Sequence, residues 1–201
     1  MRRRSETTKK TIIIAARQLF LSQGYVGTTV DAVAEQAKVT KRTVYGYFPD
    51  KRALFKGVIE DAVGDPWEFH TPLEGIVTTE GLWNALYAIG TGINEIINQP
   101  DYVQLLRVVI AEIVTQPDLG ILFERGATRR ALRTVAGLLH AAELHNILSL
   151  KNADAAARQF VGGFVMRVFL DGLLQPSCQR LQKLDNTELA DYVDDFMGRV
   201  T

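Results

Sequence analysis

The ten residues from Val39 to Phe48, VTKRTVYGYF, constrain the fold of this chain more than any other stretch. Thr40 suits a helix N-cap, and Val44 and Phe48 repeat at i and i+4, so the stretch predicts a short helix with one inward face. The outward face combines two cations, a hydroxyl and two phenols: Lys41, Arg42, Thr43, Tyr45 and Tyr47. Such groups neutralise phosphates, reach base edges and hydrogen-bond to backbone oxygens, which indicates contact with a nucleic acid.

The preceding segment predicts a partner helix. Thr29 suits its N-cap, and Asp31 falls near its positive N-terminal end. Its apolar residues fall at i, i+3, i+4 and i+7: Val30, Val33, Ala34 and Ala37. Because only Lys38 and Val39 separate the two helices, they must cross steeply, as in a helix-turn-helix. An ordinary helical hairpin with a solvated basic face has the same periodicity, so the pattern alone leaves both interpretations open.

The segment from Lys10 to Asp61 resembles the DNA-binding domain of TetR-family transcriptional regulators. The matching features are a glycine after the first helix, a threonine pair, a Tyr-x-x-Phe pattern and a lysine opening the fourth helix: Gly24, Thr28, Thr29, Tyr45, Phe48 and Lys51. The resemblance implies DNA contacts from Thr28, Thr29, Thr40, Lys41, Arg42, Thr43, Tyr45, Tyr47 and Lys51. Lys38 stands where the family commonly has glycine, which predicts a left-handed backbone there at a cost of about 1 kcal/mol.

Charge divides the chain into two parts. Residues 1–60 hold 12 Lys/Arg and 5 Asp/Glu, a net charge of +7, whereas residues 61–201 hold 11 and 18, a net charge of −7. This division indicates a nucleic-acid-binding part over residues 1–60 and a part that does not bind nucleic acid over residues 61–201. The resemblance implies that the first part is a DNA-binding domain and the second an effector-binding and dimerisation domain. The proline- and glycine-containing segment 65–79 is the expected break between them.

Other features exclude several classes of protein. The single cysteine, Cys178, rules out an internal disulfide and a cysteine-rich metal site. No apolar run reaches 18 residues, so we expect no membrane span and a cytoplasmic location, with the arginines of residues 2–4 forming a flexible arm. His140 and His145 lack the i, i+4 spacing of metal ligands, and enzyme signatures are missing. We therefore expect no metal, no cofactor and no enzymatic activity.

Periodicity in the remaining chain predicts an all-α protein. The first helix is expected over residues 8–22, and Asp50 is expected to cap a fourth helix. Further helices are expected over residues 80–98, 101–115, 117–144 and 153–174. A capping box formed by Asp185 and Glu188 opens the last helix. The fold class is therefore all-α, with a helix-turn-helix domain of three helices before a second helical domain.

One face of the predicted helix 80–98 suggests a ligand cavity. Trp83, Tyr87, Gly90 and Asn94 lie about 100° round the helix from its aliphatic stripe. Tyr102, Leu106, Arg107 and Phe123, from the two helices that follow, complete an apolar and aromatic lining. Such a lining favours a lipophilic or aromatic small-molecule effector, although a stripe of this kind is as often plain core.

The last two predicted helices carry more large apolar residues than the domain is expected to cover, and Gly162 and Gly163 permit close helix approach. In the TetR family, the final two helices of each subunit form a four-helix bundle with those of its twin. The resemblance therefore implies a homodimeric, ligand-responsive repressor that binds a palindromic double-stranded DNA operator and is released by its effector. In the alternative, the C-terminal domain serves only dimerisation or a protein partner, and a cavity would separate the two.

Overall fold

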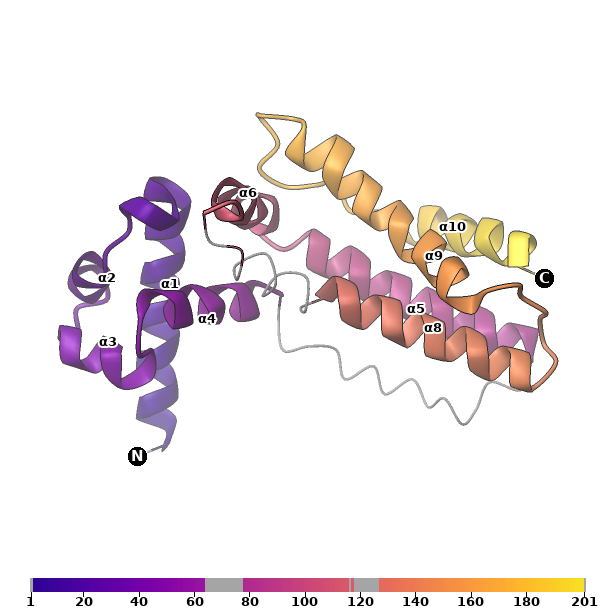
Figure 1. The fold of residues 1–201 in the computed structure, drawn as a ribbon, viewed down its shortest axis with the longest axis horizontal. Helices are drawn as coiled ribbons and strands as arrows, with labels where there is room; N and C mark the ends of the chain where they lie inside the picture. The colour runs from indigo at the N-terminus through magenta and orange to yellow at the C-terminus, as the bar shows by residue number, and fades with distance from the viewer. Residues whose placement is uncertain (1, 64–77, 116, 118–126, 201) are drawn as a thin grey trace. The chain divides into compact units, whose positions relative to one another are not determined.

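The computed structural model describes residues 2–63, 78–115, 117 and 127–200, and regular secondary structure in these ranges is entirely helical (Figure 1). The all-α prediction is therefore confirmed. The chain divides into two compact units, Met1–Asp65 with Gln104–Phe123, and Pro66–Val103 with Glu124–Thr201. The assignment of separate functions to residues 1–60 and 61–201 stays a prediction.

Four helices build most of the first unit: α1 (Arg2–Gly27), α2 (Val30–Gln36), α3 (Lys41–Tyr47) and α4 (Lys51–Val63). Regular helix in α1 is broken at Gly24, whose φ of 71° is left-handed. The helix begins at Arg2 rather than near Thr8, so the expectation of a flexible arginine arm is wrong for the backbone. Figure 1 shows α2 nearly end-on and α3 from the side, so the two helices cross steeply.

An aromatic cluster holds α1 against α4. The Phe20 and Phe55 rings meet edge to face with centroids 4.7 Å apart, and the Tyr25 ring lies 5.8 Å from Phe20 and 5.2 Å from Phe55. Nearby, Arg17 donates a 2.5 Å hydrogen bond to the Asp61 carboxylate and so joins the same two helices by an ion pair. Both contacts fix the scaffold on which α2 and α3 sit.

The second unit contains α5 (Thr79–Ile97), α8 (Ala127–Leu144), α9 (Ala153–Arg167) and α10 (Asn186–Val200). α5 packs on α8 and α10, and α8 packs on α9 (Figure 1). A π-helical segment, η2 (Val168–Leu173), continues α9. The predicted capping box opens α10, because Asp185 N–H donates to Glu188 Oε2 and Glu188 N–H donates to Asp185 Oδ1, each at 2.9 Å.

α6 (Tyr102–Glu112) differs from its prediction. Its first two residues group with the second unit and Gln104 onward groups with the first. Apolar residues are spread over most of the circumference of the segment 101–115, a pattern that predicts a helix buried all round, but Ile110 within α6 and Ile113 just after it are 48% and 41% exposed. That prediction is wrong at the C-terminal end of α6. Residues 118–126 of the predicted helix 117–144, Phe123 among them, lie outside the described residues.

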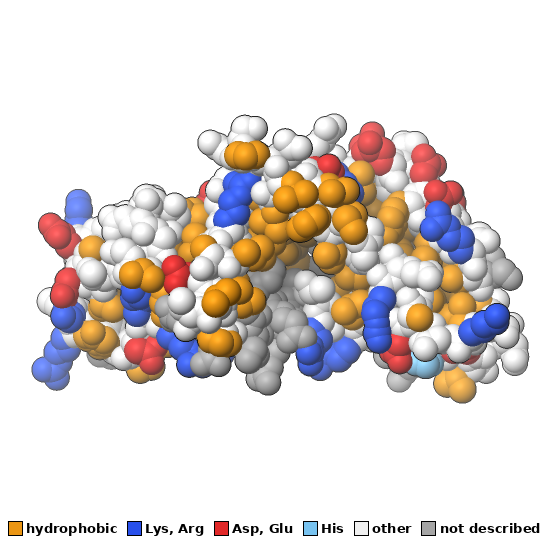
Figure 2. Space-filling model, turned by 45° about the horizontal axis from the view of Figure 1, so that its top comes forward, with side chains coloured by type: hydrophobic (Ala, Val, Ile, Leu, Met, Phe, Trp, Pro, Cys, Tyr) orange, Lys and Arg blue, Asp and Glu red, His pale blue; other side chains and the backbone are white. Residues whose placement is uncertain are grey.

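Large hydrophobic side chains also reach the surface (Figure 2). One run lies along α9 and η2 and continues to the residue after η2; we call it the α9–η2 face, and it consists of Val165, Met166, Phe169, Leu170 and Leu174. Among the helices described, none has both the length and the apolar character that crossing a membrane requires.

Candidate nucleic-acid interface

Two side-chain caps and a tight turn position the helix-turn-helix. Thr29 Oγ1 accepts a 3.1 Å hydrogen bond from Ala32 N–H at the start of α2, and Thr40 Oγ1 accepts one of 3.1 Å from Thr43 N–H at the start of α3. Lys38 adopts the predicted left-handed conformation, with φ of 53°. Its N–H donates to Glu35 O at 3.0 Å, which closes the turn between the helices. Both predicted caps are confirmed.

The inward side of α3 is held by apolar packing. Val44 is fully buried, and the Phe48 ring lies against α4 where Gly57 leaves room for it. A Cβ at Gly57 would come within 2.7 Å of Phe48 Cε1, so the glycine is required for this close approach. Because the inward face is fixed in this way, the remaining side chains of α3 point away from the core.

The two cations at the start of α3 have different surroundings. Lys41 Nζ lies 2.8 Å from Asp31 Oδ1 and donates a 2.9 Å hydrogen bond to Oδ2, and this hydrogen bond raises the pKa of Lys41. Arg42 is exposed, and the part of the chain that the structure describes offers it neither an ion pair nor a hydrogen bond. Arg42 is therefore free to bind a ligand, whereas Lys41 must first exchange its carboxylate partner.

Hydroxyl groups precede and follow these cations in the sequence of α3 and its N-cap. Thr43 Oγ1 lies 2.8 Å from Thr40 Oγ1, and Tyr45 is 44% exposed. Tyr47 Oη lies 3.1 Å from Ser5 Oγ, which ties the end of α3 to the first turns of α1. The structure thus brings the predicted contacts Thr40, Lys41, Arg42, Thr43, Tyr45 and Tyr47 together on one short helix and its cap.

Lys51 and Thr28 hold the loop between α1 and α2. The Lys51 ammonium donates to Val26 O at 3.2 Å and to Thr28 O at 2.9 Å, and it lies 4.5 Å from the centroid of the Tyr25 ring. Its partial burial lowers the pKa of Lys51. Thr28 is 1% exposed, and its hydroxyl donates to Gly24 O at 2.8 Å. The Thr28 side chain is therefore directed into the protein in this structure and supports the loop. The DNA contacts of Thr28 and Lys51 stay predictions.

The predicted effector residues on α5 face α10. Trp83 and Tyr87 stack with ring centroids 5.0 Å apart, and Trp83 Nε1–H donates a 2.6 Å hydrogen bond to Asp194 Oδ1. At Gly90, a Cβ would lie 3.0 Å from the Leu189 side chain. Both partner residues belong to α10, so this face of α5 is in contact with the last helix.

Asn94 is buried and bonds to the segment before α10. Its amide Nδ2 donates to Leu184 O at 2.9 Å, and its Oδ1 accepts from Leu184 N–H at 3.2 Å. These two bonds commit the side chain to the backbone. In this structure Asn94 therefore anchors the connection between η2 and α10, and its contact with an effector stays a prediction.

The other predicted effector residues are divided between the two units and the part of the chain outside the described ranges. Tyr102 is buried in the second unit, and burial raises the pKa of Tyr102 to about 12. Leu106 and Arg107 group with the first unit, where Arg107 donates a 3.0 Å hydrogen bond to Gln104 Oε1. Phe123 lies outside the described residues. Whether these side chains share a cavity with α5 stays a prediction.

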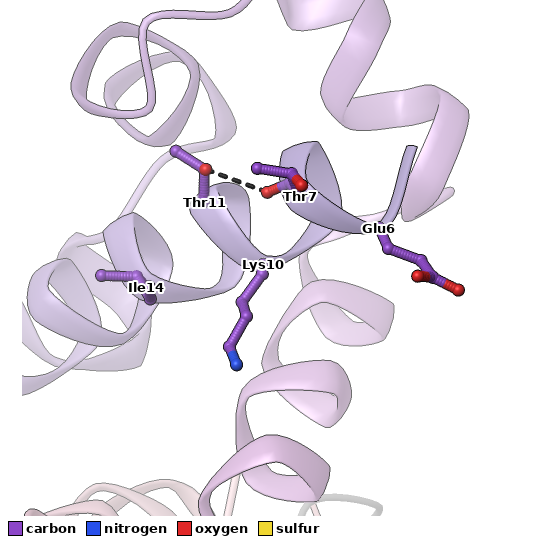
Figure 3. Close-up of a pocket in the computed structure, with 5 residues that line it drawn as sticks. All are labelled: Glu6, Thr7, Lys10, Thr11 and Ile14. Atoms are coloured by element: carbon purple, nitrogen blue, oxygen red, sulfur yellow. Dashed lines mark hydrogen bonds between the residues drawn. The ribbon is translucent and has the colours of Figure 1, made fainter. Parts of the chain in front are cut away.

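Two hollows of the surface differ from an effector site. One of about 380 Å³ lies on the exposed side of α1, and the residues lining it all belong to this helix: Glu6, Thr7, Lys10, Thr11 and Ile14 (Figure 3). The other, of about 80 Å³, lies between α9 and α10 and is smaller than the 300 to 1,000 Å³ typical of small-molecule sites. Neither encloses an apolar ligand.

Sequence reasoning missed the partners of these side chains. Asp31 holds Lys41, Ser5 meets Tyr47, and Asp194 accepts from Trp83. The Asp31 pair joins residues only 10 apart, across the turn between the two helices. The other two join segments 42 and 111 residues apart, and no local pattern indicates such pairs.

Residues 12–58 match the model of bacterial regulatory proteins of the tetR family, and residues 84–199 match the C-terminal domain of AefR-like transcriptional repressors. The HTH-type transcriptional regulator HbdR of Aromatoleum sp. (strain CIB) is 35% identical over 86 residues, 41% of this chain and 37% of HbdR. The uncharacterized HTH-type transcriptional regulator YdeS of Bacillus subtilis (strain 168) is 45% identical over 53 residues, 26% of this chain and 27% of YdeS. The chain thus spans about a quarter to two fifths of the length of these curated relatives.

Solved structures extend the similarity to nearly the whole chain. The Flavonoid-responsive Regulator FrrA aligns with a TM-score of 0.71 and 25% identity, covering 98% of both chains. A TetR transcriptional regulator from Agrobacterium tumefaciens aligns with a TM-score of 0.72 and 19% identity, covering 96% of this chain and 94% of that one. The helix-turn-helix geometry, the family match over more than half of the chain and these alignments agree. The chain belongs to the TetR family of bacterial transcriptional regulators.

Proposed function

We propose that this protein is a homodimeric repressor that binds a palindromic operator and is released from it by a lipophilic or aromatic effector. The observation that carries the proposal is the exposed basic and aromatic side of α3, held outward by two capped helices and the turn at Lys38. A single helix of this length contacts few base pairs, so specific binding requires two copies that read two half-sites about one helical turn, or a multiple of it, apart. Such a regulator works beside the chromosome, in the cytoplasm.

The α9–η2 face supports the homodimer. Its five large apolar side chains are each between 47% and 55% exposed and follow one another along a helical face. Contiguous exposed apolar surface of this kind is typical of a protein interface. A second copy of the chain would bury it in a two-fold symmetric contact, in which the same face of each subunit packs on the other.

The effector class is inferred from the Trp83–Tyr87 stack. Two parallel rings with one indole N–H already bonded to Asp194 offer flat apolar surface and few free polar groups. A flat, neutral molecule matches that chemistry, because aromatic faces bind other aromatic faces in offset stacks. FrrA, which is 25% identical over 98% of this chain, is a flavonoid-responsive regulator, and this similarity supports the same ligand class here.

The effector controls DNA binding without any chemical step. In one conformation of the dimer the two helix-turn-helix domains are misplaced for operator binding. A ligand that binds better to that conformation shifts the population towards it. A coupling free energy of about 1 to 3 kcal/mol weakens operator binding roughly 5- to 150-fold.

A second candidate function follows from the packing of Gly90 and Asn94. Leu189 and the Leu184 backbone take up the positions next to them, as in an ordinary helix interface. In that case the second unit serves only dimerisation or binds a protein partner, and the protein is not released by a small molecule.

Footprinting the purified protein on the DNA that flanks its own gene tests the proposal. We expect one protected segment with two-fold symmetric sequence, because a symmetric dimer presents two identical reading helices. A panel of flat aromatic compounds, flavonoids included, is then screened for a raised melting temperature and for loss of protection. No protection would contradict DNA regulation by this chain, and protection that no stabilising compound reverses would favour the second candidate function.

A further inference from the structure

Asp31 connects the two helices of the helix-turn-helix through a charged contact. It lies in the first turn of α2, and both of its carboxylate oxygens are within 2.9 Å of the Lys41 ammonium at the first residue of α3. The Asp31 and Lys41 side chains are 66% and 52% exposed. An acid on the supporting helix therefore holds the first cation of the reading helix, at a surface that DNA can reach.

This contact makes the neighbouring cations unequal. Arg42 has no such partner among the described residues, so its charge is available to any phosphate. The charge of Lys41 is compensated, and its ammonium must exchange Asp31 for a new acceptor. Exposed ion pairs are weak, so that exchange is feasible, but it is favourable only where an acceptor lies within reach of the Lys41 side chain.

We propose that Asp31 is a specificity-determining residue, which withholds Lys41 from DNA of arbitrary sequence and releases it on the operator. The inference rests on the proposed DNA-binding function. On non-operator DNA the protein is not held in one register relative to the phosphates. Lys41 therefore stays paired with Asp31, and the Asp31 carboxylate repels the DNA backbone. On the operator, the fixed register offers Lys41 a base edge or a phosphate that replaces the carboxylate.

The test replaces Asp31 by asparagine, which keeps the size and polarity of the side chain but removes its charge. With Lys41 free, we expect affinity for a random-sequence duplex to rise about 3- to 10-fold at low salt. We also expect the slope of log K against log salt to steepen by about 0.9 for each subunit that gains a phosphate contact. The ratio of operator affinity to random-duplex affinity should fall. The operator used in this test is a sequence recovered by selection from random duplexes.

Glu35→Gln is the matched control. Glu35 is exposed on the same short helix, the substitution removes the same charge, and the described residues provide its carboxylate with no ion pair. We expect Glu35→Gln to change affinity slightly and to leave the salt slope as in the wild type. Asp31→Ser, with a residue that also suits the start of a helix, guards against a folding defect in Asp31→Asn.

The decisive test repeats the Asp31 substitution in a protein that also carries Lys41→Met. If Asp31 acts through Lys41, Asp31→Asn in the Lys41→Met protein should have no more effect than Glu35→Gln. Equal salt slopes and equal affinity ratios for the folded Asp31 and Glu35 variants would overturn the inference while leaving the proposed function intact. A wild-type protein that binds no duplex at low salt would overturn both.

Discussion

Arg42 and Lys41 are adjacent in the sequence, but the structure gives them different tasks. Arg42 is exposed and unpaired among the described residues, and its guanidinium can bind a guanine edge with two hydrogen bonds. Lys41 is paired with Asp31 and offers a single ammonium group. Direct selection between bases is therefore expected to rest on Arg42, with Lys41 adding a contact that depends on release from Asp31.

Replacing Arg42 by alanine should weaken operator binding by about 1 to 3 kcal/mol and relax the preference at the bases it contacts. Lys41→Ala should act in the same direction. Lys56→Ala is the control, because Lys56 is an exposed lysine of α4 paired with Glu60 at 3.6 Å, and its loss removes the same charge. Fluorescence anisotropy on the operator and on singly substituted operators gives the free energies. If all three variants lose the same affinity on every duplex, α3 is not the helix that reads bases.

Single residues also show what the sequence could predict about this interface. Thr29, Thr40 and Asp50 were predicted as caps, because capping joins groups two or three residues apart and leaves a local pattern. The burial of Thr28 could not be predicted in this way, because it depends on how the loop folds back on Gly24. Distant partners such as Leu184, 90 residues from Asn94, leave no local pattern at all.

Among whole elements, α9 and α10 owe their close contact to one glycine. Gly163 faces the Tyr192 ring, and Tyr192 Oη donates a hydrogen bond to the Phe160 carbonyl. The Phe160 ring also lies edge-on to Tyr192 and Phe196, at 5.5 and 5.1 Å between centroids. The sequence predicted that a glycine pair would permit close approach here, and the structure assigns that role to Gly163, since a Cβ at Gly162 would meet open space.

Gly163→Ala should therefore destabilise the second unit by about 1 to 3 kcal/mol, because its Cβ would come within 2.8 Å of Tyr192 Cε2 and displace a half-buried ring. Gly137→Ala is the control: Gly137 lies inside α8, where a Cβ meets nothing within 4 Å. Alanine favours a helix over glycine by about 1 kcal/mol, so Gly137→Ala should be neutral or stabilising. Urea unfolding measures both, and equal effects of the two substitutions would show that Tyr192 moves aside without cost.

The helices themselves were predictable where their periodicity is strong. α5 and α10 were found from the spacing of their apolar residues, and the capping box of α10 marked its start. The prediction of burial was wrong at the end of α6, because a run of apolar residues indicates burial but does not say what covers it. The change from α9 to the π-helical η2 was also missed, since one additional residue per turn leaves no mark in a short hydrophobic pattern.

For the molecule as a whole, the burial of α9 and α10 decides which substitutions can test the proposed dimer. Phe164 and Phe196 are large apolar residues of the last two predicted helices, but they are 1% and 6% exposed and belong to the core of one protomer. The physical reason is that α9 has two apolar faces. Phe160 and Phe164 pack on Tyr192 of α10, and the second face, with Phe169 on η2, is left outside. Substitutions that test dimerisation therefore belong on the α9–η2 face.

Phe169→Glu should yield a folded monomer, because Phe169 is 48% exposed in one protomer and a carboxylate there remains solvated when the subunits part. Phe164→Glu should instead unfold the second unit, since a charge would be buried without a partner. Leu144→Glu is the control, because Leu144 is 83% exposed on α8, outside the α9–η2 face, and this variant should remain dimeric. Sedimentation velocity gives the oligomeric state and circular dichroism the folding of each variant. Operator affinity should fall with the dimer, because each monomer presents one reading helix to a two-fold site. A Phe169→Glu protein that sediments as a dimer would place the subunit contact on another face.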